Sequence, residues 1–180
     1  MGTDGVTIYG IIMYVNFIFV SVFLGYSIGS APIIGYHYGA GNREELKGLL
    51  RKSICLILIF SLALTGIAEL FARPLSAIFV GYNKELLAVA AHAFSISALS
   101  FLFSGFNIFA SSFFTALNDG LTSALISFGR TLVFEMIAVL VLPVFFGANG
   151  IWSAVAIAEI FACLLSVFFY VKKKDIYHYV

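Results

Sequence analysis

The chain has 180 residues, of which 62% are hydrophobic and only 11% are charged, and its mean hydropathy is +1.06. Soluble domains carry about 25% charged residues, so this chain has too few polar side chains to cover a water-soluble globule. The lipid bilayer is therefore its expected solvent and partner. A net charge of +1 gives no basic surface for nucleic acid, which we exclude as a partner.

Five apolar segments are long enough to cross a bilayer, which takes about 20 residues. They cover residues 6–36, 48–71, 86–117, 121–146 and 150–171. These segments predict an all-α, polytopic transmembrane bundle of five spanning helices, with residues 1–180 forming a single unit. Between the second and third segments, residues 73–85 contain Pro74, Gly81 and a short apolar piece suited to the membrane interface.

Residues 25–42, GYSIGSAPIIGYHYGAGN, are unusually rich in glycine for a helix-forming stretch. Ser21, Gly25 and Gly29 are four residues apart, a spacing that lets two membrane helices approach closely. Pro32 would bend a helix here, which is tolerated in lipid because neighbouring groups satisfy the freed backbone. The stretch predicts a closely packed, kinked helix that ends in a polar turn.

Basic residues define the expected orientation. Seven of them follow the first or the fifth predicted helix, on the same side of the membrane: Arg43, Lys47, Arg51, Lys52, Lys172, Lys173 and Lys174. Arg73 and Lys84 fall on the other side. Because basic residues stay on the cytoplasmic side, we expect a multi-pass protein of the cell membrane with its N-terminus outside and its C-terminus in the cytoplasm.

Polar side chains follow one face of the third segment, at spacings of three or four residues. They are Ser97, Ser100, Ser104, Asn107 and Ser111. One interpretation is a packing seam of small residues, and the other is the wall of a water-filled or substrate cavity. The full amide of Asn107 favours the cavity at that position, because it needs hydrogen-bonding partners. Asn16 in the first segment presents the same two alternatives.

Three ionisable side chains lie deep in the last two segments: Arg130, Glu135 and Glu159. At 1.5 Å per residue, both glutamates lie roughly 15 Å from the same end of their helices, close to the middle of the bilayer. Arg130 and Glu135 are five residues apart, which in an α-helix separates them by about 140° around the axis. We therefore expect each to contact another helix. A buried charge is costly in lipid, so such groups form ion pairs or hydrogen bonds between helices, or they bind ions and protons.

No enzyme signature is present: the sequence has no HExxH, no P-loop and no GxGxxG after a strand. Cys55 and Cys163 stand alone in apolar runs, without the spacing of metal ligands. We therefore expect neither catalytic residues, nor a metal, nor a cofactor.

Several motifs together resemble the multidrug and toxic compound extrusion (MATE) family of transporters. The first is residues 25–42, quoted above. The others are FFTAL at 113–117, SFGR at 127–130, LP at 142–143, FGANGIW at 146–152, and Ala158-Glu159 in the last helix. In order and spacing these later motifs are similar to the last two helices of that family.

The resemblance implies a fold and a function. Family members have twelve helices in two lobes, and they export cationic or amphipathic drugs against a proton or sodium gradient. This chain is similar to helices eight to twelve, so the first lobe and the seventh helix would have to come from elsewhere, as a missing N-terminal part or a second chain. A proline that the family has early in its eleventh helix is replaced in the neighbourhood of Glu135.

Together these observations predict part of a secondary active multidrug exporter. An amphipathic or cationic compound would bind a cavity near Asn16, Phe103 and Asn107, and protonation or sodium binding at Glu135 and Glu159, beside Arg130, would drive its exchange. The sequence leaves open a proton or a sodium ion. It also leaves open a non-transporting structural fragment and a lipid-linked polysaccharide flippase of the same superfamily. Without the seventh helix, we expect an exposed groove along Ser21, Gly25 and Gly29.

Overall fold

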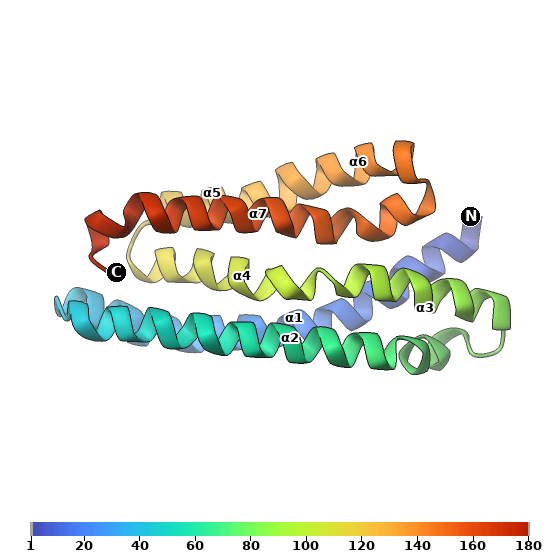
Figure 1. Ribbon diagram of the computed structural model, residues 1–180, viewed down its shortest axis with the longest axis horizontal. Coiled ribbons are helices and arrows are strands. Elements are labelled where there is room, and N and C mark those ends of the chain that lie inside the picture. Colours follow the sequence, from blue (N-terminus) through green and yellow to red (C-terminus); the bar gives the residue numbers. More distant parts are fainter. Residues whose placement is uncertain (1, 180) are drawn as a thin grey trace.

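The computed structural model describes residues 2–179, which form a bundle of long helices lying side by side (Figure 1). The elements are α1 (Gly2–Gly39), α2 (Arg43–Val80), α3 (Lys84–Ala98), α4 (Phe101–Ala116), α5 (Gly120–Phe128), the π-helical η1 (Gly129–Phe134), α6 (Glu135–Phe146) and α7 (Ala148–Tyr177). These residues contain no strand, and the predicted all-α transmembrane bundle is confirmed.

Four helices are each long and apolar enough to cross a membrane: α1, α2, the continuous α5–η1–α6, and α7. The helices α3 and α4 pass the same test as a pair, bent by 42° at the short break between them. With this pair counted as one span, the structure has the five spanning helices expected from the sequence. The position of this bend was not predicted.

The second helix differs from the prediction. α2 begins at Arg43, where the side chain of Asn42 caps it by accepting a hydrogen bond from the Glu45 amide, and it continues through Pro74 to Val80. The short apolar piece that we expected at the membrane interface is therefore the last part of this helix, not a separate segment. Proline is compatible with a helix of this kind because neighbouring groups satisfy the freed backbone carbonyl.

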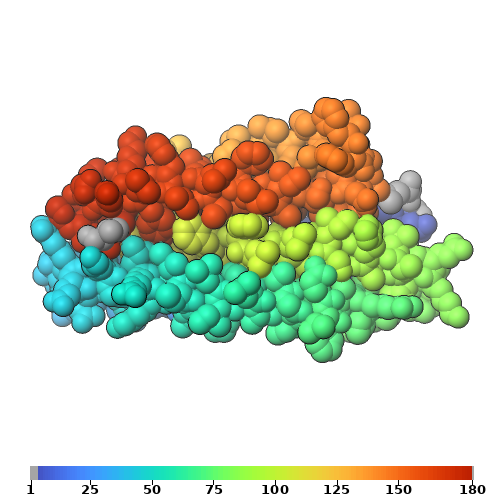
Figure 2. Space-filling view, in the orientation of Figure 1, coloured from blue at the N-terminus to red at the C-terminus, as the bar shows by residue number. Residues whose placement is uncertain are grey.

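α4 is the central helix of the bundle, in contact with α1, α2, α5 and α7. Figure 2 shows part of it between the α7 layer and the α2 layer. Its close packing depends on Gly105, where an added Cβ would lie 2.5 Å from the Phe23 ring and 3.1 Å from Ile57. Only glycine permits this approach of three helices.

The two larger hydrophobic clusters of the interior are separated along the bundle. One contains Phe94, Phe101 and Trp152, and the other contains Phe109, Phe113 and the C-terminal Tyr179. On α4 the stretch 102–108, and on α7 the stretch 153–168, lie between the residues of the two clusters. Of the deep polar side chains expected from the sequence, Ser104, Asn107 and Glu159 occur in these stretches.

The basic residues after α1 gather at the same end of the bundle as those at the end of α7. Residues of the α1–α2 turn line a shared cavity with Ile176 and Tyr177, and Figure 1 shows the C-terminus beside this turn. We call this the basic end. It also holds the α4–α5 turn, where Asp119 forms a 3.1 Å ion pair with Lys173. The side of the membrane that this end faces remains a prediction.

The expected exposed face on α1 is present. Ser21, Gly25 and Gly29 are all exposed, and apart from the adjacent residues and nearby backbone of α1 itself, no described atom lies within 4 Å of a Cβ placed on either glycine. The prediction that this face is uncovered in this chain is therefore confirmed.

Candidate functional site

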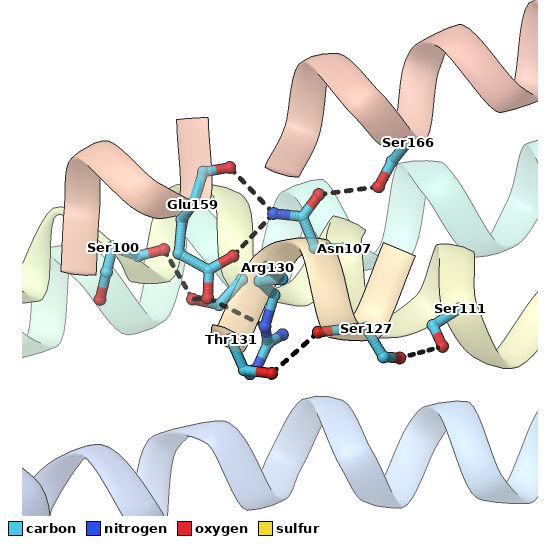
Figure 3. Close-up of polar contacts among 9 residues, drawn as sticks. Ser100, Asn107, Ser111, Ser127, Arg130, Thr131, Glu159 and Ser166 are labelled. Carbon is cyan, nitrogen blue, oxygen red and sulfur yellow. Dashed lines mark hydrogen bonds and ion pairs between the residues drawn. The ribbon is translucent and has the colours of Figure 1, made fainter. Parts of the chain in front are cut away.

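Glu159 is the centre of the polar site, half-way along α7, with only 5% of its surface exposed. Its Oε1 accepts a 3.0 Å hydrogen bond from Ser104 Oγ on α4 and lies 3.5 Å from Nε of Arg130 on η1. Its Oε2 accepts a 2.6 Å hydrogen bond from Asn107 Nδ2 (Figure 3). The carboxylate is thus held by three side chains from two other elements, as a buried charge requires.

Asn107 connects α4 to α7 through both ends of its amide. Its Nδ2 donates to the backbone carbonyl of Glu159 at 2.9 Å as well as to the carboxylate, and its Oδ1 accepts from Ser166 Oγ at 3.1 Å. Asn107 is 1% exposed. The amide that the sequence singled out therefore has its partners within the chain, and they fix the position and orientation of Glu159.

Arg130 lies on a π-helical segment, and this changes its relation to Glu135. The amide of Glu135 donates to the carbonyl of Arg130, an i→i+5 bond that makes a wider turn than an α-helix. The expected separation of 140° assumed α-helical geometry throughout and is wrong. Both side chains line the same cavity. The expectation that Arg130 pairs with another helix is confirmed by its contact with Glu159.

That cavity, which we call the carboxylate cavity, has a volume of about 180 Å³. Its charged lining residues are Arg130, Glu135 and Glu159, so both glutamates border the same cavity. Arg130 and Glu159 compensate each other, whereas Glu135 forms no hydrogen bond or ion pair with another described residue. In its ionised form Glu135 leaves the cavity with one uncompensated negative charge.

The structure separates the three side chains that were expected to contact substrate. Asn16 lines the carboxylate cavity, and its Oδ1 is buried without a hydrogen-bond partner among residues 2–179. Phe103 is half-buried on α4 and is not one of the residues that line this cavity. The aromatic rings that line it are Tyr9 and Phe17 of α1.

The polar face of the third span combines both proposed interpretations. Ser97 donates to the carbonyl of Trp152 on α7, and this bond belongs to a packing seam. Ser104 belongs to the seam and also lines the carboxylate cavity. Ser111 lines a second cavity near α5. The described residues contain no group of three His, Cys, Asp or Glu side chains placed to hold a metal ion.

Comparison with known proteins decides the family. The model of the MatE family matches residues 1–141, more than three quarters of this chain. The chain belongs to the MatE family. Among curated proteins, this MatE chain is 26% identical over 163 residues to the probable multidrug resistance protein NorM of Thermotoga maritima, covering 83% of the chain and 32% of that protein.

Solved structures show the same fold. A MATE crystallised in complex with MaL6 matches with a TM-score of 0.90 at 18% identity, covering 99% of this MatE chain and 41% of that one. The Vibrio cholerae MATE transporter VcmN in its bent form matches with a TM-score of 0.88 at 21% identity, covering 98% and 41%. The chain therefore spans about a third of its curated relative and about two fifths of the solved transporters.

The sequence did not point to all the polar residues that surround the candidate site of this MatE chain. Ser166, the partner of Asn107, gave no signal because a single serine is common in membrane helices. The hydroxyls Ser123, Ser127 and Thr131 continue the four-residue spacing of Asp119, and this spacing could have revealed them.

Proposed function

We propose that this chain is part of a secondary active exporter that exchanges amphipathic or cationic compounds for protons or sodium ions. The observation that carries this proposal is the unpaired carboxyl group of Glu135 in a cavity beside the compensated pair of Arg130 and Glu159. A single uncompensated charge inside a membrane protein is a site at which cations compete, and it is rarely retained without a function.

Competition for this charge provides the exchange. Ionised Glu135 attracts a cationic compound, and a proton or sodium ion that neutralises the carboxylate releases that compound. The free Oδ1 of Asn16 offers the bound cation a second oxygen, and the rings of Tyr9 and Phe17 offer apolar and cation–π contacts. The cationic compound and the proton or sodium ion therefore displace each other from the same carboxylate, which is the minimal requirement of antiport.

The other polar residues have supporting roles in this proposal. Asn107 and Ser104 hold Glu159, and Glu159 holds Arg130 beside the carboxylate cavity. We therefore reassign Asn107 from substrate contact to positioning of Glu159. Phe103, which lies outside the carboxylate cavity, is replaced as the aromatic contact by Tyr9 and Phe17.

The test is equilibrium binding of tetraphenylphosphonium to the chain in lipid nanodiscs, measured by calorimetry at several values of pH and sodium concentration. Glu135→Gln should weaken binding at least 10-fold, a loss of about 1.4 kcal/mol. It should also abolish the competition by protons or sodium that the parent shows. Glu69→Gln is the matched control, because Glu69 is an exposed carboxylate on α2 and its loss should leave binding unchanged.

Two results contradict the proposal. Equal affinities of the parent and Glu135→Gln for tetraphenylphosphonium would show that Glu135 is not part of the binding site. Absence of saturable binding in the parent would instead favour a non-transporting fragment, an alternative that the short span of the chain relative to NorM already makes worth testing.

A further inference from the structure

Two rows of hydroxyl groups face each other between α4 and the α5–η1 segment. The first row is Ser111 and Thr115 on α4, and the second is Ser123 and Ser127 on α5 with Thr131 on η1. The members of each row are four residues apart, so each row follows one face of its helix. We call the two rows the hydroxyl ladder.

Hydrogen bonds join four of these hydroxyls into a continuous chain. Thr115 Oγ1 lies 2.7 Å from Ser123 Oγ, which lies 2.9 Å from Ser111 Oγ. Ser111 Oγ in turn lies 2.7 Å from Ser127 Oγ (Figure 3). In each of these contacts either oxygen can be the donor. Such a chain can reverse its direction without breaking.

The ladder leads from one ion pair to another. Near the basic end, the α4–α5 turn holds Asp119, which is paired with Lys173. At the inner end, the next residue before Thr131 is Arg130, which is paired with Glu159. Arg130 is eleven residues after Asp119, so the ladder covers roughly 16 Å of the depth of the bundle.

A second cavity opens along the inner half of the ladder. Its volume is about 310 Å³, and its polar lining includes Ser27, Ser111, Ser127 and Arg130. Ser27 is 2% exposed, and its Oγ has no hydrogen-bond partner among the described residues. A buried hydroxyl without a protein partner is normally satisfied by water.

We propose that this cavity and the hydroxyl ladder form a water-filled path from the basic end of the bundle to Arg130. Arg130 lines both this cavity and the carboxylate cavity, so it lies at the boundary between them. Its pairing with Glu159 offsets the positive charge that would otherwise repel a cation at the inner end of the path. Water reaching this point also hydrates the ion pair and lowers the cost of burying it.

The path also carries the coupling proton, a part of the inference that rests on the proposed function. A proton that leaves the carboxyl group of Glu135 breaks one O–H bond and forms another on water. Each water or hydroxyl in the chain then accepts one proton and donates another, so one proton is transferred in total and no other reactant is needed.

Thiol reactivity tests the water content of the path. Cys55 and Cys163 are first replaced by alanine, and Ser127→Cys or Ser111→Cys is then introduced in the chain in lipid nanodiscs. Because the reactive thiolate forms only where water is present, both cysteines should react with a small membrane-impermeant methanethiosulfonate at least 10-fold faster than Leu125→Cys. Leu125 is 47% exposed on the same helix but is not part of the ladder. Equal rates at Ser127→Cys and Leu125→Cys would show that the path is dry and would overturn the inference.

The proton is tested separately, by the rate at which protons are released when tetraphenylphosphonium binds. Ser111→Ala combined with Ser127→Ala should slow this release several-fold while binding affinity stays unchanged. An unchanged rate would overturn the proton path. If the parent releases no proton at all, the proposed proton coupling fails, whereas the thiol measurement still decides whether the path contains water.

Discussion

Replacing Asn107 with alanine tests whether this amide organises the polar site. The substitution removes three hydrogen bonds between α4 and α7: two that Nδ2 donates to Glu159 and one that Oδ1 accepts from Ser166. All three side chains are buried, with Asn107 at 1% and Ser166 at 0% exposure. No bulk water can replace the lost partners without entering the bundle.

The expected loss follows from these three bonds. A hydrogen bond between membrane helices is worth about 0.6 kcal/mol on average, and one to a charged group about 1.5–3 kcal/mol. Two bonds of the first kind and one of the second, to the carboxylate of Glu159, give a destabilisation of about 3 kcal/mol. The chain has a single tryptophan, Trp152, which is buried on α7 and reports on this part of the bundle.

The assay is reversible unfolding in mixed detergent micelles, followed by Trp152 fluorescence. Asn16→Ala is the matched control, because the Oδ1 of Asn16 has no partner among the described residues and its removal should change stability by less than about 0.5 kcal/mol. If Asn107→Ala is no more destabilising than Asn16→Ala, the bonds to Glu159 and Ser166 do not stabilise the bundle and the positioning role fails.

The same assay checks two further predictions. Gly105→Ala should destabilise the chain by about 1–3 kcal/mol, because its Cβ would overlap the Phe23 ring. Gly25→Ala, where no described atom of another helix lies within 4 Å of the added Cβ, should instead stabilise the chain by about 0.5–1 kcal/mol. Equal effects would contradict the close packing on α4. Asp119 lies outside the spans, and although burial alone would raise its pKa, hydrogen bonds from Thr122, Tyr177 and Lys173 lower that pKa from 3.8 to about 2. The stabilisation by ionised Asp119 is complete above pH 3.8 and is lost as the pH falls towards 2. Asp119→Asn should therefore lose less stability between these two pH values than the parent does. Parallel losses in the two proteins would refute the stabilising role of the Asp119 carboxylate.

Much of the architecture followed from composition and spacing. Apolar segments of membrane length gave the five spans, and the placement of basic residues after α1 and α7 correctly put both groups at one end of the bundle. The cost of burying charge in lipid was enough to select Arg130, Glu135 and Glu159 as a group. The four-residue spacing of Gly25 and Gly29 predicted a closely packed helix, whereas this face is exposed in the structure, as expected for a chain that is similar only to helices eight to twelve.

The partners within the site were decided only by the tertiary structure. Helices such as α6 are apolar on all sides, so no hydrophobic periodicity in the sequence indicates how they are rotated. The π-helical η1 adds a further change of rotation, and it brings Arg130 and Glu135 to one cavity although α-helical spacing places them apart. The sequence therefore determined which charged side chains lie in the membrane. The packing of α4 against α7 and η1 decided that Glu159 is paired, whereas Glu135 has no hydrogen-bond or ion-pair partner among residues 2–179.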